Sequence, residues 1–444
     1  MKEFFLNTES KTIKSNLFLV LLVGVISTLF LPLPINSVFI VALLLWSLVN
    51  LNKVNFRNLA ATDSVLIIFF LWLALSYTWS INKEDTLNAI IKQASFFIFP
   101  LAFIVFQKKY LTPVLKWFSY TLFFISLIFI IRAIIRFFVL KDTNVFFFHG
   151  DYSSDFGLVP KELNAVYVGA FSCLAFVYFL IKESKTITDY IMGSVLLVFI
   201  LLLNATIILI TTAFIVVIYF SFYSKTSNRM RLRNLILIIL LLTAALFYKK
   251  VNQFFIQEFK TNTSKGIGHD VIPQIPSAKH RITIYEAWNN QNFTPNDFFP
   301  GTAFRVYQAR LFFEFLKEEP IFWTGFGLNA SYKKLEEKGI YYNVFQGNDE
   351  VEGYQKKNFH NQYIQVFAEL GVIGFLLLLL ILGLNLKNAL KNKDFLHIAF
   401  AILMISLFLT ESFLWRQRGV VFFTLFYCLF NLKNTRQNCI KQTS

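Results

Sequence analysis

Long apolar runs recur along the chain from Asn16 to Leu432, and one long polar stretch interrupts them. A membrane-spanning helix needs about 20 apolar residues, or somewhat fewer when it is packed inside a bundle. The stretch 188–223 is too long for one helix and requires a tight reversal near Asn204–Thr206. The pattern therefore predicts an all-α integral membrane protein with about twelve transmembrane helices, at approximately 15–32, 35–51, 63–81, 89–107, 114–137, 163–181, 188–204, 207–223, 233–249, 363–386, 395–413 and 417–432.

The polar stretch divides the chain into three parts. Residues 1–249 hold the first nine predicted helices, 250–362 form one large loop between the ninth and tenth, and 363–444 hold the last three helices and a tail. We call the middle part the 250–362 loop. Apolar residues recur at helical spacing behind Pro300 until Pro320, so we expect this loop to be partly helical. On that helix Arg305 and Arg310 flank the apolar face on opposite sides.

The composition supports a membrane protein, because 56% of residues are hydrophobic and 15% are charged, whereas soluble domains carry about a quarter charged residues. A net charge of +16 would suggest nucleic-acid binding in a soluble protein. Here basic residues gather in short loops, which predicts cytoplasmic termini, an extracytoplasmic 250–362 loop and no nucleic-acid partner. The basic residues of the predicted cytoplasmic loops are Lys53, Arg57, Lys108, Lys109, Lys116, Lys182, Lys185, Lys225, Arg229, Arg231, Arg233, Lys387, Lys391 and Lys393.

His360 is the first candidate for chemistry, because it stands just before the helix that is predicted to start near Tyr363. A helix N-terminus carries a partial positive charge, which favours the neutral imidazole. The neutral form is the one that a general base requires. The alternative is an interfacial histidine that hydrogen-bonds to the loop.

Arginines are the second group of candidates. Arg281, Arg305 and Arg310 could bind a diphosphate through paired hydrogen bonds, and the alternative is that they are solvated or contact lipid headgroups. Arg132 and Arg136 lie one turn apart near the outer end of the fifth predicted helix, where basic residues are either functional or snorkel to the headgroups. Glu411 could pair structurally with Arg416 or Arg418.

The sequence lacks the usual motifs for metal or nucleotide binding. It has no His/Cys cluster, no tight carboxylate pair, and no phosphate-cradling glycine loop before a Lys-Ser or Lys-Thr pair. We therefore predict group transfer without a metal or a cofactor.

Three stretches resemble the O-antigen ligase and O-antigen polymerase superfamily of bacterial membrane glycosyltransferases. In RVYQARLFFEFLKEEPIFWTGFG, the matching positions are Arg305, Pro320, Gly325 and Gly327. In HNQYIQVFAELGVIGF, they are His360, Asn361, Glu369, Leu370, Gly371 and Gly374. The stretch YTWSINKEDTLNAIIKQ, near the third predicted helix, is similar more loosely.

The resemblance implies a reaction at the periplasmic face of the bacterial inner membrane. Such enzymes transfer a glycan from undecaprenyl diphosphate to an acceptor hydroxyl without a metal. The acceptor is lipid A–core for the ligases and another lipid-linked repeat for the polymerases. In this chain, His360 would be the base and Arg305 would bind the diphosphate, with inversion of the anomeric centre. We favour the ligase-like reaction slightly over the polymerase.

The sequence departs from the family at one place. Many relatives carry Ser-Arg or Ser-Lys at the reversal between the seventh and eighth helices, where this chain has Asn204, Ala205 and Thr206. The resemblance then implies either that Arg132, Arg136, Arg281 or Arg310 takes over the diphosphate contact, or that the substrate is held differently. Two other classes remain as alternatives. A lipid-glycan flippase is less favoured because the halves show no repeat, and a scaffold protein would use the loop to bind a partner.

Overall fold

The computed structural model describes residues 16–51, 60–105, 110–147, 157–224, single positions between 230 and 236, 280–348 and 352–442. Within these residues, five helices are long and apolar enough to cross a membrane, and six apolar helices are shorter. An all-α membrane protein is therefore confirmed. The count of twelve helices stays a prediction, because most of the ninth predicted helix lies outside the described residues.

The helices that precede the 250–362 loop follow the predicted apolar runs closely. After the apolar helix Asn16–Phe30 come α2 (Leu33–Val49), α3 (Ala61–Leu75), α4 (Lys83–Lys92), α5 (Ser95–Val105), α6 (Leu111–Leu140), α7 (Ala165–Ile181), α8 (Ile187–Leu203) and α9 (Thr206–Ile218). Asn204 has a φ of 52° and ends α8, so the predicted reversal is present. The run predicted at 89–107 is instead divided, because the amphipathic helix α4 ends at Lys92 and the apolar helix α5 begins at Ser95.

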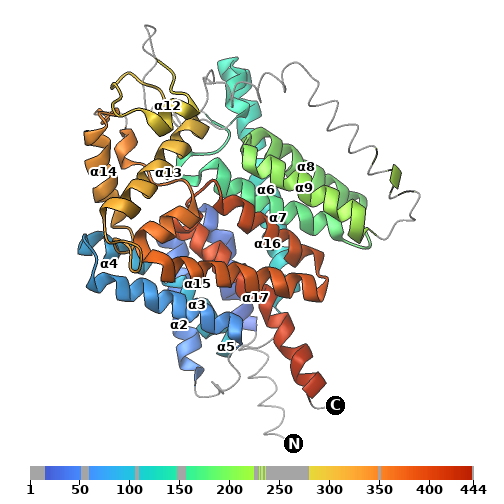
Figure 1. Ribbon diagram of the computed structural model, residues 1–444. Coiled ribbons are helices and arrows are strands. Elements are labelled where there is room, and N and C mark those ends of the chain that lie inside the picture. The colour runs from blue at the N-terminus through green and yellow to red at the C-terminus, as the bar shows by residue number, and fades with distance from the viewer. Residues whose placement is uncertain are drawn as a thin grey trace, which may run out of the picture.

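The second half contains six described helices, which are α12 (Ile284–Asn289), α13 (Gly301–Glu318), α14 (Ser331–Tyr341), α15 (Gln362–Asn392), α16 (Phe395–Phe408) and α17 (Gln417–Gln442). The described part of the 250–362 loop has an aromatic core of its own, around Phe299, Phe304, Tyr307 and Tyr354. Figure 1 shows α12, α13 and α14 grouped together on one side of the helical bundle. The boundaries of the three predicted parts stay predictions.

Helices α7 and α17 occupy the centre of the bundle. The segment of α17 from Val420 to Phe430 is at most 1% exposed, and α7 is buried along nearly its whole length. Phe400 of α16 and Phe422 of α17 lie 6.0 Å apart between ring centroids, one of many aromatic contacts here. In a bilayer such packing stabilises the helix contacts through dispersion and shape. The bundle therefore holds the connection between α16 and α17 firmly in place.

Connections that the topology predicts on one side of the membrane do meet in the structure. The Arg418 guanidinium at the start of α17 donates to the carbonyls of Leu29 (2.8 Å), Leu31 (3.0 Å) and Glu162 (2.7 Å). Leu29 and Leu31 lie at the end of the first predicted helix, and Glu162 belongs to the connection between the fifth and sixth. The connections after α3 and after α16 reach the 250–362 loop, as described below. This shared side is where the candidate residues gather.

Candidate active site

The three stretches that carry the family resemblance converge on the turn after α13. Gly325 and Gly327 have φ values of 70° and 100°, in the left-handed region that favours glycine. The amide of Gly327 donates to the Glu369 carbonyl in α15 (2.8 Å). From the connection after α3, the Trp79 indole donates to the Thr324 carbonyl (2.9 Å). Motifs far apart in sequence thus form one supporting structure.

A glycine kink in α15 lets this turn approach so closely. Gly371 has φ 68° and ψ −170°, a conformation that is essentially restricted to glycine. A β-carbon on Gly371 would overlap the backbone of Trp323, and one on Gly325 would overlap the backbone of Glu369. The amide of Val372 donates to the Phe322 carbonyl (2.7 Å). The kink separates a short segment, 362–370, from the long membrane segment.

His360 lies immediately before this short segment, as the sequence predicts. Asn361 caps α15, because its side-chain oxygen accepts hydrogen bonds from the amides of Tyr363 (3.0 Å) and Ile364 (3.1 Å). The Asn361 side chain also donates to the Leu409 carbonyl (3.0 Å). His360 itself has a φ of 47°, which is uncommon outside glycine and concentrated at functional sites. The cap thus fixes His360 against the connection between α16 and α17.

Glu411 faces His360 from that connection. His360 Nδ1 lies 3.6 Å from Glu411 Oε2, an ion-pair distance. Burial alone would raise the pKa of Glu411. The nearby charges of His360, Arg305 and Arg416 outweigh it and hold this pKa below its ordinary value. Both ring nitrogens of His360 are buried without a hydrogen-bond partner among the described residues. Nε2 is therefore not engaged by another described side chain or backbone group.

Several contacts hold the backbone around Glu411. The Gln362 side chain accepts from the Leu414 amide (2.7 Å). On the other side, the Tyr167 hydroxyl donates to the Phe413 carbonyl (3.1 Å), and the two rings stack with centroids 4.6 Å apart. Since α7, α15 and α17 all contribute, the carboxylate is placed by the core of the bundle. Such rigid support is what a preorganised site requires.

Two arginines lie near this pair. Arg305 in α13 donates from Nε to the Thr410 carbonyl and from Nη1 to the Gly301 carbonyl, both at 3.2 Å. Arg416 places its guanidinium 5.7 Å from the Tyr167 ring centroid. Within the described part of the chain, the Arg416 guanidinium has no hydrogen bond or ion pair. The arrangement therefore combines a histidine, a carboxylate and two guanidiniums.

Arg310 lies elsewhere, on the opposite side of α13 from Arg305. It is buried and bonds to Glu314 Oε1 (2.8 Å), the Asn290 carbonyl (2.6 Å) and the Tyr342 hydroxyl (2.9 Å). Burial raises the pKa of Glu314, but hydrogen bonds from Tyr342, Lys338 and Arg310 bring it below its ordinary value. This network joins α13 to α14 and stabilises the loop.

The other three predicted arginines lie on other segments of the chain. Arg281 lies over the Phe298 ring, 5.9 Å from its centroid. Arg136 donates to the Gly157 carbonyl (3.4 Å). Arg132 lies one turn before it, in the last third of the 30-residue helix α6, beyond the roughly 20 residues that a bilayer needs. The structure thus brings Arg305, and not these three, to the histidine.

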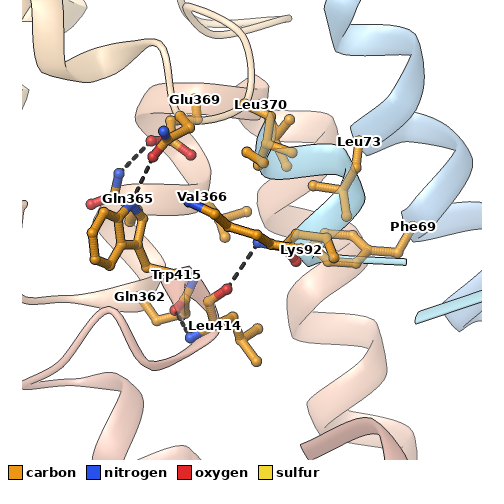
Figure 2. Close-up of a pocket in the computed structure, with 14 residues that line it drawn as sticks. Phe69, Leu73, Lys92, Gln362, Gln365, Val366, Glu369, Leu370, Leu414 and Trp415 are labelled. Atoms are coloured by element: carbon orange, nitrogen blue, oxygen red, sulfur yellow. Dashed lines mark hydrogen bonds between the residues drawn. The ribbon is translucent and has the colours of Figure 1, made fainter. Parts of the chain in front are cut away.

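A small cavity lined by both polar and apolar side chains lies between the first segment of α15 and the connection that holds Trp415 (Figure 2). Glu369, which is 3% exposed, accepts a hydrogen bond from Ser331 (3.0 Å) and contacts the Gln365 side-chain amide. Gln362 and Trp415 also line this cavity, whose volume is about 20 Å³. That space fits about one water molecule and no sugar or phosphate. Glu369 therefore connects α14 to the first segment of α15 through its contacts with Ser331 and Gln365.

Sequence reasoning did not place Glu411 or Arg416 beside His360. It suggested that Glu411 could pair structurally with Arg416 or Arg418. In the structure the carboxylate lies beside His360, the nearby Arg416 charge helps to lower its pKa, and Arg418 binds backbone carbonyls. One pattern could have indicated them. The short connection ESFLWRQRG carries three charged residues between two strongly apolar helices, and such charges are costly unless they serve a function.

Comparison with known proteins supports the same family. A search of curated proteins found no match. The family model described as O-Antigen ligase matches residues 190–379, a range that includes α13, the glycine turn, His360 and the kink of α15. The chain therefore carries an O-antigen ligase domain at residues 190–379, and this match supports the O-antigen ligase superfamily, whose members are membrane glycosyltransferase-like enzymes.

Proposed function

We propose that this protein is an O-antigen ligase-like glycosyltransferase. It moves a glycan from undecaprenyl diphosphate to an acceptor hydroxyl, such as one on lipid A–core. The observation that carries the proposal is the meeting of His360, Glu411, Arg305 and Arg416 beside the kinked start of a membrane helix. A base, its charged partner and two guanidiniums are the groups that metal-independent transfer from a diphosphate requires.

In the proposed reaction, His360 Nε2 accepts the proton of the acceptor hydroxyl. The hydroxyl oxygen then attacks the anomeric carbon, and the bond from that carbon to the diphosphate oxygen breaks. Attack opposite the leaving group inverts the anomeric centre. Glu411 stabilises the imidazolium that forms, as a carboxylate does for histidine bases in general.

The leaving diphosphate would bind Arg305 and Arg416. Guanidiniums pair with phosphate oxygens through parallel hydrogen bonds, so they stabilise the charge that develops there. This assignment supplies a second basic contact where the chain lacks a charge at Asn204–Thr206. Among the arginines named from the sequence, Arg310, Arg281, Arg136 and Arg132 would then serve structure or headgroup contact.

We infer that this reaction takes place at the periplasmic face of the bacterial inner membrane, with both termini cytoplasmic. The support is the positive-inside distribution together with the contacts among connections of one predicted side. A polysaccharide polymerase is the second candidate. It would use the same residues, with another lipid-linked repeat as acceptor.

The deciding experiment compares glycan profiles of a knockout strain complemented with variants. We expect the knockout to accumulate lipid-linked polymer with naked lipid A–core, and wild type to restore attachment. His360→Ala should insert and accumulate but restore no attachment. His280→Ala is the matched control, since His280 is exposed and pairs with Glu286 in the loop.

Each other profile contradicts a stated part of the proposal. Single-repeat glycans on lipid A in the knockout would show that the protein is a polymerase and not a ligase. Glycan that stays on the cytoplasmic face would indicate a flippase. Normal attachment by His360→Ala would remove His360 as the base.

A further inference from the structure

Large aromatic side chains are exposed along one part of the 250–362 loop. The exposed fractions are 66% for Trp323, 49% for Phe322 and Phe313, and 44% for Trp288. Burying such rings would be favourable by roughly 25 cal/mol per Å² of apolar surface. Exposure of several together marks an interaction surface.

These rings form a continuous row. Ring centroids are 6.0 Å apart for Trp288 and Phe313, 5.5 Å for Phe313 and Phe312, and 5.4 Å for Phe312 and Phe367. Phe367 in turn lies 5.9 Å from Phe322, whose ring is 5.1 Å from that of Trp323. We call these six residues the aromatic row. It connects α12, α13, the turn after α13 and the first segment of α15.

The aromatic row continues into the membrane-facing surface of α15. The Phe367 ring lies 5.5 Å from Phe375, which is past the kink in the long apolar segment. On that segment, Ile373, Leu376 and Leu380 are 37%, 56% and 46% exposed, as expected of side chains that face lipid. The exposed aromatics therefore lie at the end of a lipid-facing surface.

We propose that the aromatic row rests in the headgroup region of the outer leaflet, so that the helices α12 and α13 lie on the bilayer. Tryptophan and other amphipathic rings are enriched at this depth of membrane proteins. Lys317 lies one turn after Phe313 on α13, where its ammonium can reach lipid phosphates while its stem follows the apolar surface. The occupant of this surface is bilayer lipid.

This contact has a consequence for the candidate active site. The helix α13 carries both Arg305 and Phe313, which are eight residues and about 12 Å apart along its axis. A loop held at headgroup depth therefore keeps Arg305 near the level where a lipid-linked diphosphate lies. The bilayer contact itself does not depend on the proposed reaction.

Site-directed fluorescence tests the contact in the full-length protein. Phe313→Cys and Trp323→Cys, each with Cys439→Ser, are labelled with an environment-sensitive maleimide dye and reconstituted into phosphatidylcholine–phosphatidylglycerol vesicles without polyprenyl lipid. Tyr341→Cys is the control, because Tyr341 is 69% exposed on α14. The native thiols Cys173 and Cys428 are buried. Two quenchers are used: spin-labelled lipid in the bilayer, and iodide in the solution inside and outside the vesicles.

We expect spin-labelled lipid to quench positions 313 and 323 at least about twofold more than position 341, with the reverse order for iodide. Equal iodide quenching at all three positions would overturn the proposal. Protection of 313 and 323 from both quenchers would also overturn it, because protein would then cover the row. The two test positions lie on different elements, so loss of one variant to misfolding leaves the other informative.

Discussion

His360 Nδ1 lies 3.6 Å from Glu411 Oε2, and the two residues come from opposite ends of the α15–α16 helix pair. A carboxylate at this place stabilises the protonated imidazole and orients the ring, as it does in other enzymes with histidine bases. The two connections are fixed to each other by the Asn361 side chain, which donates to the Leu409 carbonyl. This pairing yields sharper predictions than the histidine alone.

Replacement of Glu411 by Gln should slow glycan attachment strongly. We expect a loss of about a hundredfold, at the lower end of what general acid–base catalysis contributes. The reason is that the amide cannot stabilise the imidazolium although it keeps the shape of the side chain. The measurement is the rate of glycan attachment in complemented knockout cells, normalised to membrane protein level.

Glu336→Gln is the control for this change, because Glu336 is exposed on α14. It should attach glycan at the wild-type rate. An unchanged rate in Glu411→Gln would show that the carboxylate does not assist His360.

Acid should destabilise the protein partly through Glu411. Its pKa is lower in the folded state than its ordinary value, so the folded state binds fewer protons than the unfolded state. The stabilisation is therefore present above the unfolded pKa of about 4.3 and is lost as pH falls through the lower folded pKa. Thermal unfolding in detergent between about pH 6 and pH 3 measures this loss. Glu411→Gln should show a shallower pH dependence, and an identical slope would contradict the assigned ion pair.

The helix pattern and the position of His360 could be predicted from the sequence because both are local. Apolar runs set the helices, and Asn361 caps α15 next to His360. The reversal at Asn204 was predictable for the same reason. In each case the residues that decide the structure are neighbours in the chain.

Long-range partners were harder to predict. Local spacing suggested Arg416 or Arg418 as the partner of Glu411. In the folded bundle the Glu411 carboxylate faces His360, and the Arg418 guanidinium donates to backbone carbonyls. Charge and helical spacing alone made both Arg305 and Arg310 candidates for diphosphate binding, and only the family resemblance singled out Arg305. They differ in the structure because Arg305 contacts the α16–α17 connection, whereas Arg310 contacts Tyr342 at the end of α14. Which face meets which element depends on tertiary packing.

Replacement of Arg310 should therefore lower the stability of the protein, whereas replacement of Arg305 should lower its activity. Arg310→Ala leaves Glu314 without one buried partner, and we expect a loss of about 3 kcal/mol in stability. Arg305→Ala should keep nearly the wild-type melting temperature but lose glycan attachment. Thermal unfolding and glycan profiles of both variants measure the difference.

Arg305→Lys refines this comparison, because lysine keeps the charge but loses the planar pair of donors. It should restore attachment only partly. If Arg310→Ala were fully stable and inactive while Arg305→Ala were active, the two assignments would have to be exchanged.

Gly371→Ala should disrupt the junction between the glycine turn and α15. The backbone at φ 68° and ψ −170° would cost a β-carbon about 1–3 kcal/mol in strain. The added atom would also overlap the backbone of Trp323 and push away the turn that follows α13. We expect a lower melting temperature and weak glycan attachment, measured by thermal unfolding and by complementation.

Gly383→Ala is the matched control on the same helix. A β-carbon there meets nothing within 4 Å, and alanine favours the helix over glycine by about 1 kcal/mol. This variant should be as stable as wild type or slightly more stable, with normal attachment. If both variants behaved alike, the effect at Gly371 would reflect general helix propensity, and the close approach of the two motifs would not be required for function.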